Sequence, residues 1–294
     1  MPAHLLLLVA FSLAAACYGE RTVVGRTGTY YNPSMCHESL PCGGNVDVHY
    51  PFFLANATMA IDGYWAYSPY CGYAGMAIVC DGGYAVLMLS GRSYTVLDID
   101  YENHAITLAD TDLIGSDDDC PRVTHNVTLP EETRLKPTDD DSLSFFFDCV
   151  FTPGNPQPLG ILPINCSSFQ SGGPGTMSFV ALQSDVQQQD RWTRACKTVV
   201  LVPVLQDWRL NPEYHLHLNS DGYGQVLKRG FQLSWEPSAG PCYVCEQTKG
   251  KCSYRRNGEF LGCLCSDGSL RNQDCGKPIY LSIYIASSFL ELPR

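Results

Sequence analysis

The sequence predicts a mainly β fold, with two small disulfide-rich β modules and a cysteine-rich C-terminal segment. Three observations support this prediction: runs that alternate apolar and polar residues, glycines between those runs, and 15 cysteines among 294 residues. Alternation with a period of two is typical of half-buried strands, and glycine is typical of the turns that join them. So many cysteines indicate an oxidising compartment.

The N-terminus has the pattern of a secretory signal. The apolar run Leu5–Leu13 is followed by the small residues of Ala14–Gly19. This run is shorter than the roughly 18 apolar residues that a membrane-spanning helix needs. We therefore expect residues 1–19 to be a signal peptide and the chain to be secreted, to the extracellular space or cell wall. Cleavage after Gly19 would remove Cys17 from the 15 cysteines and leave 14, an even number. Cleavage after Ala16 would leave Cys17 unpaired.

The first module is predicted to span residues 36–120. Two of its runs, Ala85–Leu89 and Tyr94–Leu108, alternate apolar and polar residues, and we expect both to form half-buried strands. Residues 121–142 are polar and acidic and include Pro130 and Pro137. That composition is typical of a linker between modules.

The second module is predicted to span residues 143–268. Its strand-like runs are Leu143–Phe151, Thr198–Leu205 and Leu227–Trp235. Pro203 lies inside the second run and favours an edge strand or a bulge there. Between the strands, Asp185–Ala195 is expected to form a helix with Trp192 facing inward. The tail, residues 269–294, has an apolar run of about a dozen residues, which is too short to span a bilayer.

Six cysteines crowd into the segment from Cys242 to Cys275. Their spacing also suits a structural zinc site, but in a secreted chain disulfides are favoured. Many pairings are possible, so the sequence leaves the connectivity open. The expected disulfide cysteines are Cys36, Cys42, Cys71, Cys80, Cys120, Cys149, Cys166, Cys196, Cys242, Cys245, Cys252, Cys263, Cys265 and Cys275.

Three sequons predict N-glycosylation in exposed loops, at Asn56, Asn126 and Asn165. In the third, early oxidation of Cys166 would compete with glycan attachment.

No catalytic motif stands out, and the chain is expected not to be an enzyme. It contains no Gly-x-Ser-x-Gly elbow, no His-Glu-x-x-His and no kinase or phosphate-loop signature. Asp98 and Asp100 would project from one strand face, where a solvated surface is favoured over a glycosidase pair. His215 and His217 lack a third ligand nearby, so no metal site is predicted. The net charge of −11 argues against nucleic acid as a partner.

Aromatic residues gather between turn signals in the first module. Such rings can stack on sugars, and their polar tips tolerate water. The alternative is that they cover a small disulfide core. The candidate ligand-binding residues are Tyr64, Trp65, Tyr67, Tyr70 and Tyr73, together with Arg92.

The first module resembles the galacturonan-binding domain of plant wall-associated receptor kinases and their leaf-rust-resistance-type relatives. The residues that carry the resemblance are Cys36, Leu40-Pro41-Cys42-Gly43, Tyr50-Pro51-Phe52, Tyr70-Cys71-Gly72, Cys80-Asp81, Tyr94 to Tyr101, Ile106 to Asp110 and Cys120.

The second module is similar to the C-terminal domain of the same kinases. This resemblance rests on Phe147-Asp148-Cys149, Cys166, Cys196, Phe231 to Trp235, the cysteines from Cys242 to Cys265, and Asp267-Gly268. The stretch Phe260 to Cys265 has one residue more after the phenylalanine than is usual in the family. Together the two resemblances cover residues 36–268 and imply a soluble ectodomain without the transmembrane helix and kinase of typical receptors.

The resemblance implies binding of pectin, a polyanion, although the first module is itself acidic. Residues 36–119 contain twelve Asp and Glu and one basic residue besides histidine, Arg92. Direct charge pairing is then poor, and Ca²⁺ bridging between carboxylates is a physical solution. We therefore expect an extracellular pectin-binding protein. The alternative is a protein-interaction module that acts as a decoy or co-receptor for full-length receptor kinases. A secreted glycoside hydrolase is a third, less favoured hypothesis.

Overall fold

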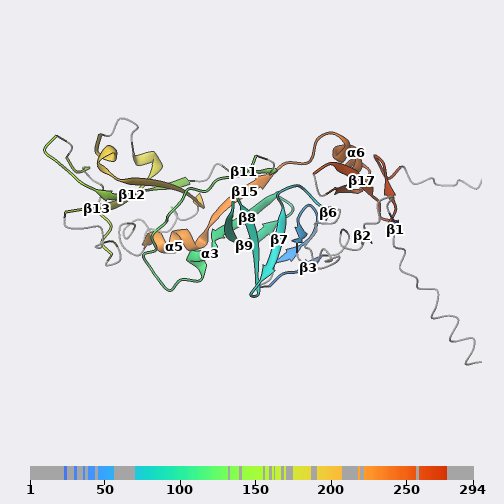
Figure 1. Ribbon diagram of the computed structural model, residues 1–294, viewed down its shortest axis with the longest axis horizontal. Helices are drawn as coiled ribbons and strands as arrows, with labels where there is room; N and C mark the ends of the chain where they lie inside the picture. The colour runs from blue at the N-terminus through green and yellow to red at the C-terminus, as the bar shows by residue number, and fades with distance from the viewer. Residues whose placement is uncertain are drawn as a thin grey trace, which may run out of the picture.

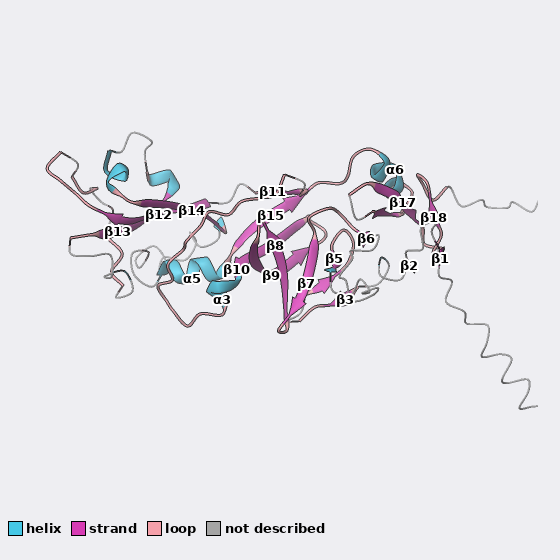
Figure 2. Cartoon of the chain, in the orientation of Figure 1, coloured by secondary structure: helices cyan, strands magenta, loops and turns pink. Residues whose placement is uncertain are grey.

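The chain forms an elongated series of β-sheets (Figure 1). The computed structural model describes residues 23–24, 30–31, 36, 39–43, 46–55, 70–131, 133–138, 141–154, 156–158, 161, 163–166, 169, 175–186, 191–206, 218, 222–255 and 258–276. Strands predominate over short helices in this part of the chain (Figure 2). The prediction of a mainly β, disulfide-rich fold is confirmed.

A seven-stranded sheet lies at the centre of the molecule, in the order β11-β15-β10-β9-β8-β7-β5. Neighbouring strands are antiparallel except for the parallel pair β5 and β7. The strands are β5 (Phe53–Leu54), β7 (Ala77–Asp81), β8 (Tyr84–Leu89), β9 (Arg92–Asp100), β10 (Ala105–Asp110), β11 (Leu135–Pro137) and β15 (Phe231–Trp235).

Residue alternation places one face of this sheet in the core. In β8, Ala85, Leu87 and Leu89 are buried, whereas Tyr84 and Met88 are exposed. The run Ala85–Leu89 therefore forms the expected strand.

The expected strand Tyr94–Leu108 is instead divided between β9 and β10 by a turn at residues 101–104. The Asp100 carboxylate closes this turn, because it accepts hydrogen bonds from the backbone N–H groups of Glu102 and Asn103 and from the Asn103 side chain. A single strand was thus the wrong prediction, because Asp100 offers the backbone a tighter, local set of hydrogen bonds.

The seven-stranded sheet draws strands from beyond the first predicted module. Ile106 of β10 pairs with Leu233 of β15, and β15 in turn pairs with β11, which lies within the predicted linker. Phe231, Leu233 and Trp235 are buried in the same core as the first module. Strand pairing therefore joins segments from the two predicted modules and from the linker predicted between them.

The run Leu227–Trp235, which was expected to form one strand, is divided between a helix and a strand. Helix α5 (Gly222–Arg229) ends at Gly230, and β15 begins directly after it. Gly230 has φ +81°, and a Cβ there would lie 2.1 Å from the Leu108 carbonyl oxygen. Only glycine allows this tight passage from helix to sheet.

A three-stranded sheet occupies one end of the molecule, in the order β13-β12-β14. It consists of β12 (Asp141–Cys149), β13 (Met177–Leu182) and β14 (Thr198–Val204). Pro203 lies in β14, an edge strand as predicted. Where a helix over Asp185–Ala195 was predicted, the described residues form two 3₁₀ turns, η3 (Gln183–Asp185) and η4 (Arg191–Ala195), and Trp192 is buried as expected.

The opposite end holds a four-stranded sheet in the order β18-β17-β16-β6, with helix α6 (Pro241–Gln247) beside it. Its strands are β6 (Tyr70–Cys71), β16 (Lys251–Tyr254), β17 (Phe260–Leu264) and β18 (Leu270–Arg271). Two small sheets and one short helix complete the described elements: β1 (Val23–Val24) with β2 (Tyr30–Tyr31), β3 (Leu40–Pro41) with β4 (Asp47–Val48), and α3 (Thr111–Ile114).

All 14 of the expected disulfide cysteines are paired. The pairs are Cys36–Cys71, Cys42–Cys80, Cys120–Cys166, Cys149–Cys196, Cys242–Cys252, Cys245–Cys263 and Cys265–Cys275. Each such bond typically stabilises a fold by about 2–4 kcal/mol. Since the clustered C-terminal sulfurs are bonded to one another, they offer no thiolates to zinc, which disfavours the zinc alternative.

The side chain of Asn126 covers an edge of the three-stranded sheet. Its Oδ1 accepts a hydrogen bond of 2.9 Å from the backbone N–H of Leu201 in β14. The exposed Asn126 thus satisfies a donor that the edge strand would otherwise present to other chains.

This contact makes a testable prediction about stability. Asn126→Ala removes the acceptor and should lower the free energy of unfolding by about 1 kcal/mol, whereas Asn126→Asp keeps an acceptor and should lose less. Both variants also remove the sequon, so the comparison between them is independent of any glycan. Urea unfolding measures the difference, and equal stabilities would show that the hydrogen bond contributes nothing.

Candidate functional site

Several residues singled out in the sequence lie outside the described part of the chain. These are Asn56, Tyr64, Trp65, Tyr67, His215 and His217. The backbone of Tyr70 belongs to β6 and pairs with Tyr254. The other two predicted sequon residues, Asn126 and Asn165, are exposed, and Cys166, next to Asn165, is bonded to Cys120.

Tyr73 is a core residue, in keeping with the alternative interpretation of the aromatic cluster. It is only 3% exposed, and its hydroxyl donates a hydrogen bond of 2.6 Å to Glu246 Oε1. The backbone N–H of Ser238 donates to the same hydroxyl at 3.1 Å. The guanidinium of Arg134 lies 5.2 Å from the centre of the ring. The ring is therefore held in place and is not available for stacking on a ligand.

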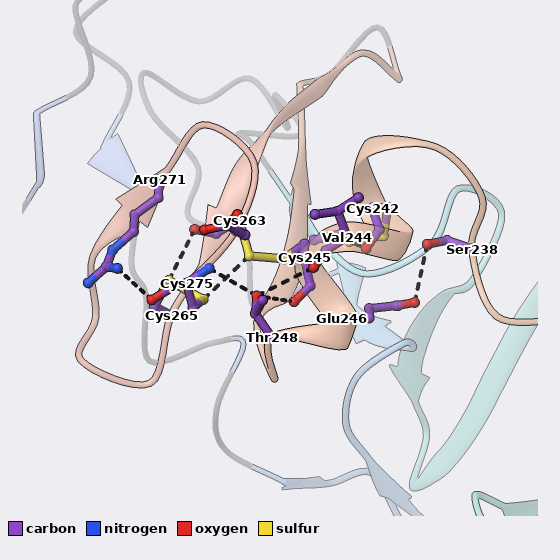
Figure 3. Close-up of a disulfide and its surroundings, with 12 residues drawn as sticks. Ser238, Cys242, Val244, Cys245, Glu246, Thr248, Cys263, Cys265, Arg271 and Cys275 are labelled. Atoms are coloured by element: carbon purple, nitrogen blue, oxygen red, sulfur yellow. Dashed lines mark hydrogen bonds between the residues drawn. A yellow bond between two sulfur atoms is a disulfide. The ribbon is translucent and has the colours of Figure 1, made fainter. Parts of the chain in front are cut away.

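Glu246 joins the cysteine-rich end to the central sheet. Its Oε1 also accepts a hydrogen bond of 2.5 Å from the Tyr50 hydroxyl, and its Oε2 accepts one of 3.2 Å from Ser238 Oγ. We call this group of Tyr50, Tyr73, Ser238 and Glu246 the Glu246 lock. Figure 3 shows the side chain of Glu246, on helix α6, directed toward Ser238. Cys245 of the same helix is bonded to Cys263.

The lock depends on protonated tyrosines. Burial, followed by the neighbouring Glu246 carboxylate, raises the pKa of both Tyr50 and Tyr73 above the ordinary value. Both hydroxyls therefore remain donors at physiological pH. Sequence reasoning missed this arrangement. Its visible signal was a carboxylate directly after the closely spaced pair Cys242 and Cys245.

A small cleft lies between the central sheet and the three-stranded end. It has a volume of about 20 Å³, which is room for roughly one water molecule. His125 Nε2 lies 3.4 Å from the Tyr94 hydroxyl and 3.5 Å from Asp110 Oδ2. Burial raises the pKa of Asp110, and burial together with Asp110 raises the pKa of Tyr94 to about 12. The cleft is too small to take a sugar ring.

The side of the central sheet that faces away from the core carries exposed and half-exposed side chains. We call it the outer sheet face. Strand register defines its residues, since cross-strand partners project to the same side. They are Tyr84, Met88, Asp98, Asp100, Thr107, Lys136, Gln232 and Ser234.

Arg92, the predicted basic ligand contact, is exposed but lies on the other side of the sheet. Its cross-strand partner is Leu89, a core residue. The outer sheet face carries a cation, Lys136 of β11, whose Nζ is 2.6 Å from Glu236 Oε2. Both of these side chains are more than half exposed, at 56% and 68%.

The fold is that of a disulfide-clamped β protein with an open, mixed-charge sheet face. Residues 36–110 match the family model of the wall-associated receptor kinase galacturonan-binding domain. Residues 165–268 match the model of the wall-associated receptor kinase C-terminal domain. The chain thus carries the domain pair of the wall-associated receptor kinase type, and the resemblance predicted from the sequence is confirmed.

The chain is also similar to curated plant proteins. It is 25% identical over 244 residues to leaf rust 10 disease-resistance locus receptor-like protein kinase-like 1.2 of Arabidopsis thaliana, covering 81% of this chain and 33% of the relative. It is 22% identical over 243 residues to the kinase-like 2.1 protein of the same plant, covering 82% of this chain and 35% of the relative. The chain thus spans about a third of the length of these relatives.

No solved structure matches the chain. Among the described residues, no helix is long and apolar enough to cross a membrane.

The Glu246 lock makes a prediction about alkaline stability. Because the pKa of Tyr73 is raised in the folded state, its contribution is complete below the unfolded-state pKa of about 10 and is lost as pH rises beyond that value. Tyr73→Phe should lower the free energy of unfolding by about 1–2 kcal/mol at neutral pH. It should also make the decline above pH 10 shallower.

Denaturant unfolding from about pH 8 to pH 11 measures this effect. Tyr84→Phe is the matched control, because Tyr84 is 56% exposed and its loss should change neither quantity. An unchanged alkaline decline in Tyr73→Phe would contradict the assigned role of the lock.

Proposed function

We propose that this chain is a secreted protein that binds acidic cell-wall polysaccharide of the galacturonan type. The observation that carries the proposal is the match of residues 36–110 to a galacturonan-binding family model. The seven disulfides and the signal-like N-terminus support an extracellular location. The two matched models belong to receptor domains, which supports a binding role over catalysis.

Binding a polyanion to an acidic domain requires a cation. Asp98 is exposed on the outer sheet face, and Asp100 lies two residues away on the same strand. The pKa of Asp100 is lowered, chiefly by the Asn103 side-chain hydrogen bond, so its carboxylate stays ionised in mild acid. Ca²⁺ prefers carboxylate oxygens and accepts six to eight of them. A bridging ion would take some ligands from these aspartates and the rest from the polymer.

The described residues alone do not build a complete calcium cage. Each of their three-residue groups with metal-ligand potential contains disulfide-bonded cysteines. A shared site, completed by uronate carboxylates, is the arrangement that the proposal requires.

The experiment that tests the proposal is binding of the secreted, glycosylated chain to a cell-wall glycan array, with Ca²⁺ and with a chelator. We expect binding to de-esterified homogalacturonan, loss of binding in chelator, and no binding to the fully methyl-esterified polymer, which lacks the carboxylates. Absence of binding to every wall glycan in both conditions would overturn the proposal.

A second candidate function is protein interaction, as a decoy or co-receptor for full-length receptor kinases. It is favoured by Tyr243 and Val244, which are 49% and 44% exposed on α6, a helix clamped by two disulfides. Rigid exposed aromatic side chains are frequent anchors in interfaces. Binding to the purified ectodomain of a related receptor kinase, weakened by Tyr243→Ser, would support this function. Equal binding by the wild-type chain and by Tyr243→Ser would show that this surface is not the interface.

A further inference from the structure

We infer that the outer sheet face is the platform for the acidic polysaccharide, and that strands from outside the galacturonan-binding match complete it. This inference rests on the proposed function and assigns it a place in the structure. The matched domain ends at residue 110, the last residue of β10. Beyond β10, the sheet continues through β15 and β11.

Two rows of side chains cross the boundary of the matched domain. In the first row, Asp98 of β9 pairs with Thr107 of β10, which pairs with Gln232 of β15. The second row runs through Asp100, Ala105, Ser234 and Lys136. With about 4.8 Å between neighbouring strands, the second row spans roughly 14 Å. Apart from Ala105, which is apolar and buried, both rows offer polar groups along a line, as an extended sugar chain requires.

The row of side chains between these two rows points into the core, and it therefore shows which side of the sheet is the outer sheet face. Ile106 and Leu233, which pair with each other, are 0% and 2% exposed. Because side chains alternate along each strand, Thr107, Gln232 and Ser234 must project from the opposite side. The structure describes these three as partly exposed, so that side of the sheet is accessible.

Lys136 supplies the positive charge that the matched domain lacks on this face. The one arginine of that domain, Arg92, lies on the core side. Lys136 pairs with Glu236, and both side chains are largely solvated. An exposed ion pair of this kind contributes little to stability. A uronate carboxylate can therefore replace Glu236 as the partner of Lys136.

Two opposite charge changes test this platform. Lys136→Gln removes the cation and leaves Glu236 to repel the polymer, so affinity for de-esterified homogalacturonan should fall about fivefold or more. Glu236→Gln removes the competing anion and should raise affinity about twofold or more. Lys197→Gln is the matched control, since Lys197 is exposed beside the three-stranded sheet, and it should bind like wild type.

The measurement is a binding isotherm on the full secreted chain at fixed Ca²⁺ and ionic strength. Unfolding curves confirm that each variant is folded. If wild type binds and all three variants bind equally, the platform is overturned while the proposed function stands. If wild type does not bind, both are overturned. A gain with Glu236→Gln together with a loss for Lys136→Gln is the supporting result, because a general folding defect would not move affinity in both directions.

Discussion

The pairing of β10 with β15 is the constraint on which the rest of the architecture depends. Ile106 and Leu108 meet Leu233 and Phe231 across this ladder, although more than a hundred residues separate the two strands. Their burial gives the central sheet its core. Gly230, whose backbone lies against Leu108, then fixes where α5 ends. Since α5 also packs into the core of the three-stranded end, one strand pair connects both hydrophobic cores, and the two matched regions of the chain fold as interdependent parts.

The cysteine-rich end is held by a different balance of forces. Its segment has few apolar side chains, so its shape depends on disulfides that restrict the unfolded chain. Those bonds order the segment internally, but they do not attach it to the central sheet. The Glu246 lock, in which Tyr50 and Tyr73 donate to a carboxylate of α6, contributes to that attachment together with the pairing of β6 and β16. Removing one partner would leave buried polar groups unpaired, which costs more than the hydrogen bond itself gains.

Sequence patterns predicted those features that depend on neighbouring residues. Alternation identified β8, the apolar run Leu143–Phe151 identified β12, and the edge position of Pro203 followed from its missing N–H. The partners of distant strands could not be predicted, because many apolar strands satisfy the same local pattern. The prediction of one strand over Leu227–Trp235 was wrong for a related reason: over so short a span, the helical and strand periods of apolar residues are hard to tell apart. The sequence left open whether Tyr73 contacts a sugar or belongs to a core. The residue that decides between them, Glu246, is distant in sequence and is brought beside Tyr73 only by the fold.

The distribution of charge suggests a functional reason for the interdependence of the two matched regions. Residues 36–119 carry twelve acidic residues and one arginine, and that arginine lies away from the outer sheet face. A polyanion approaching this face meets net repulsion unless a divalent ion or a neighbouring cation intervenes. The cation comes from β11, an edge strand that pairs with β15. Recognition of an acidic polymer on this face would therefore require the complete fold, and it would discriminate between polymers by their charge as well as by their shape.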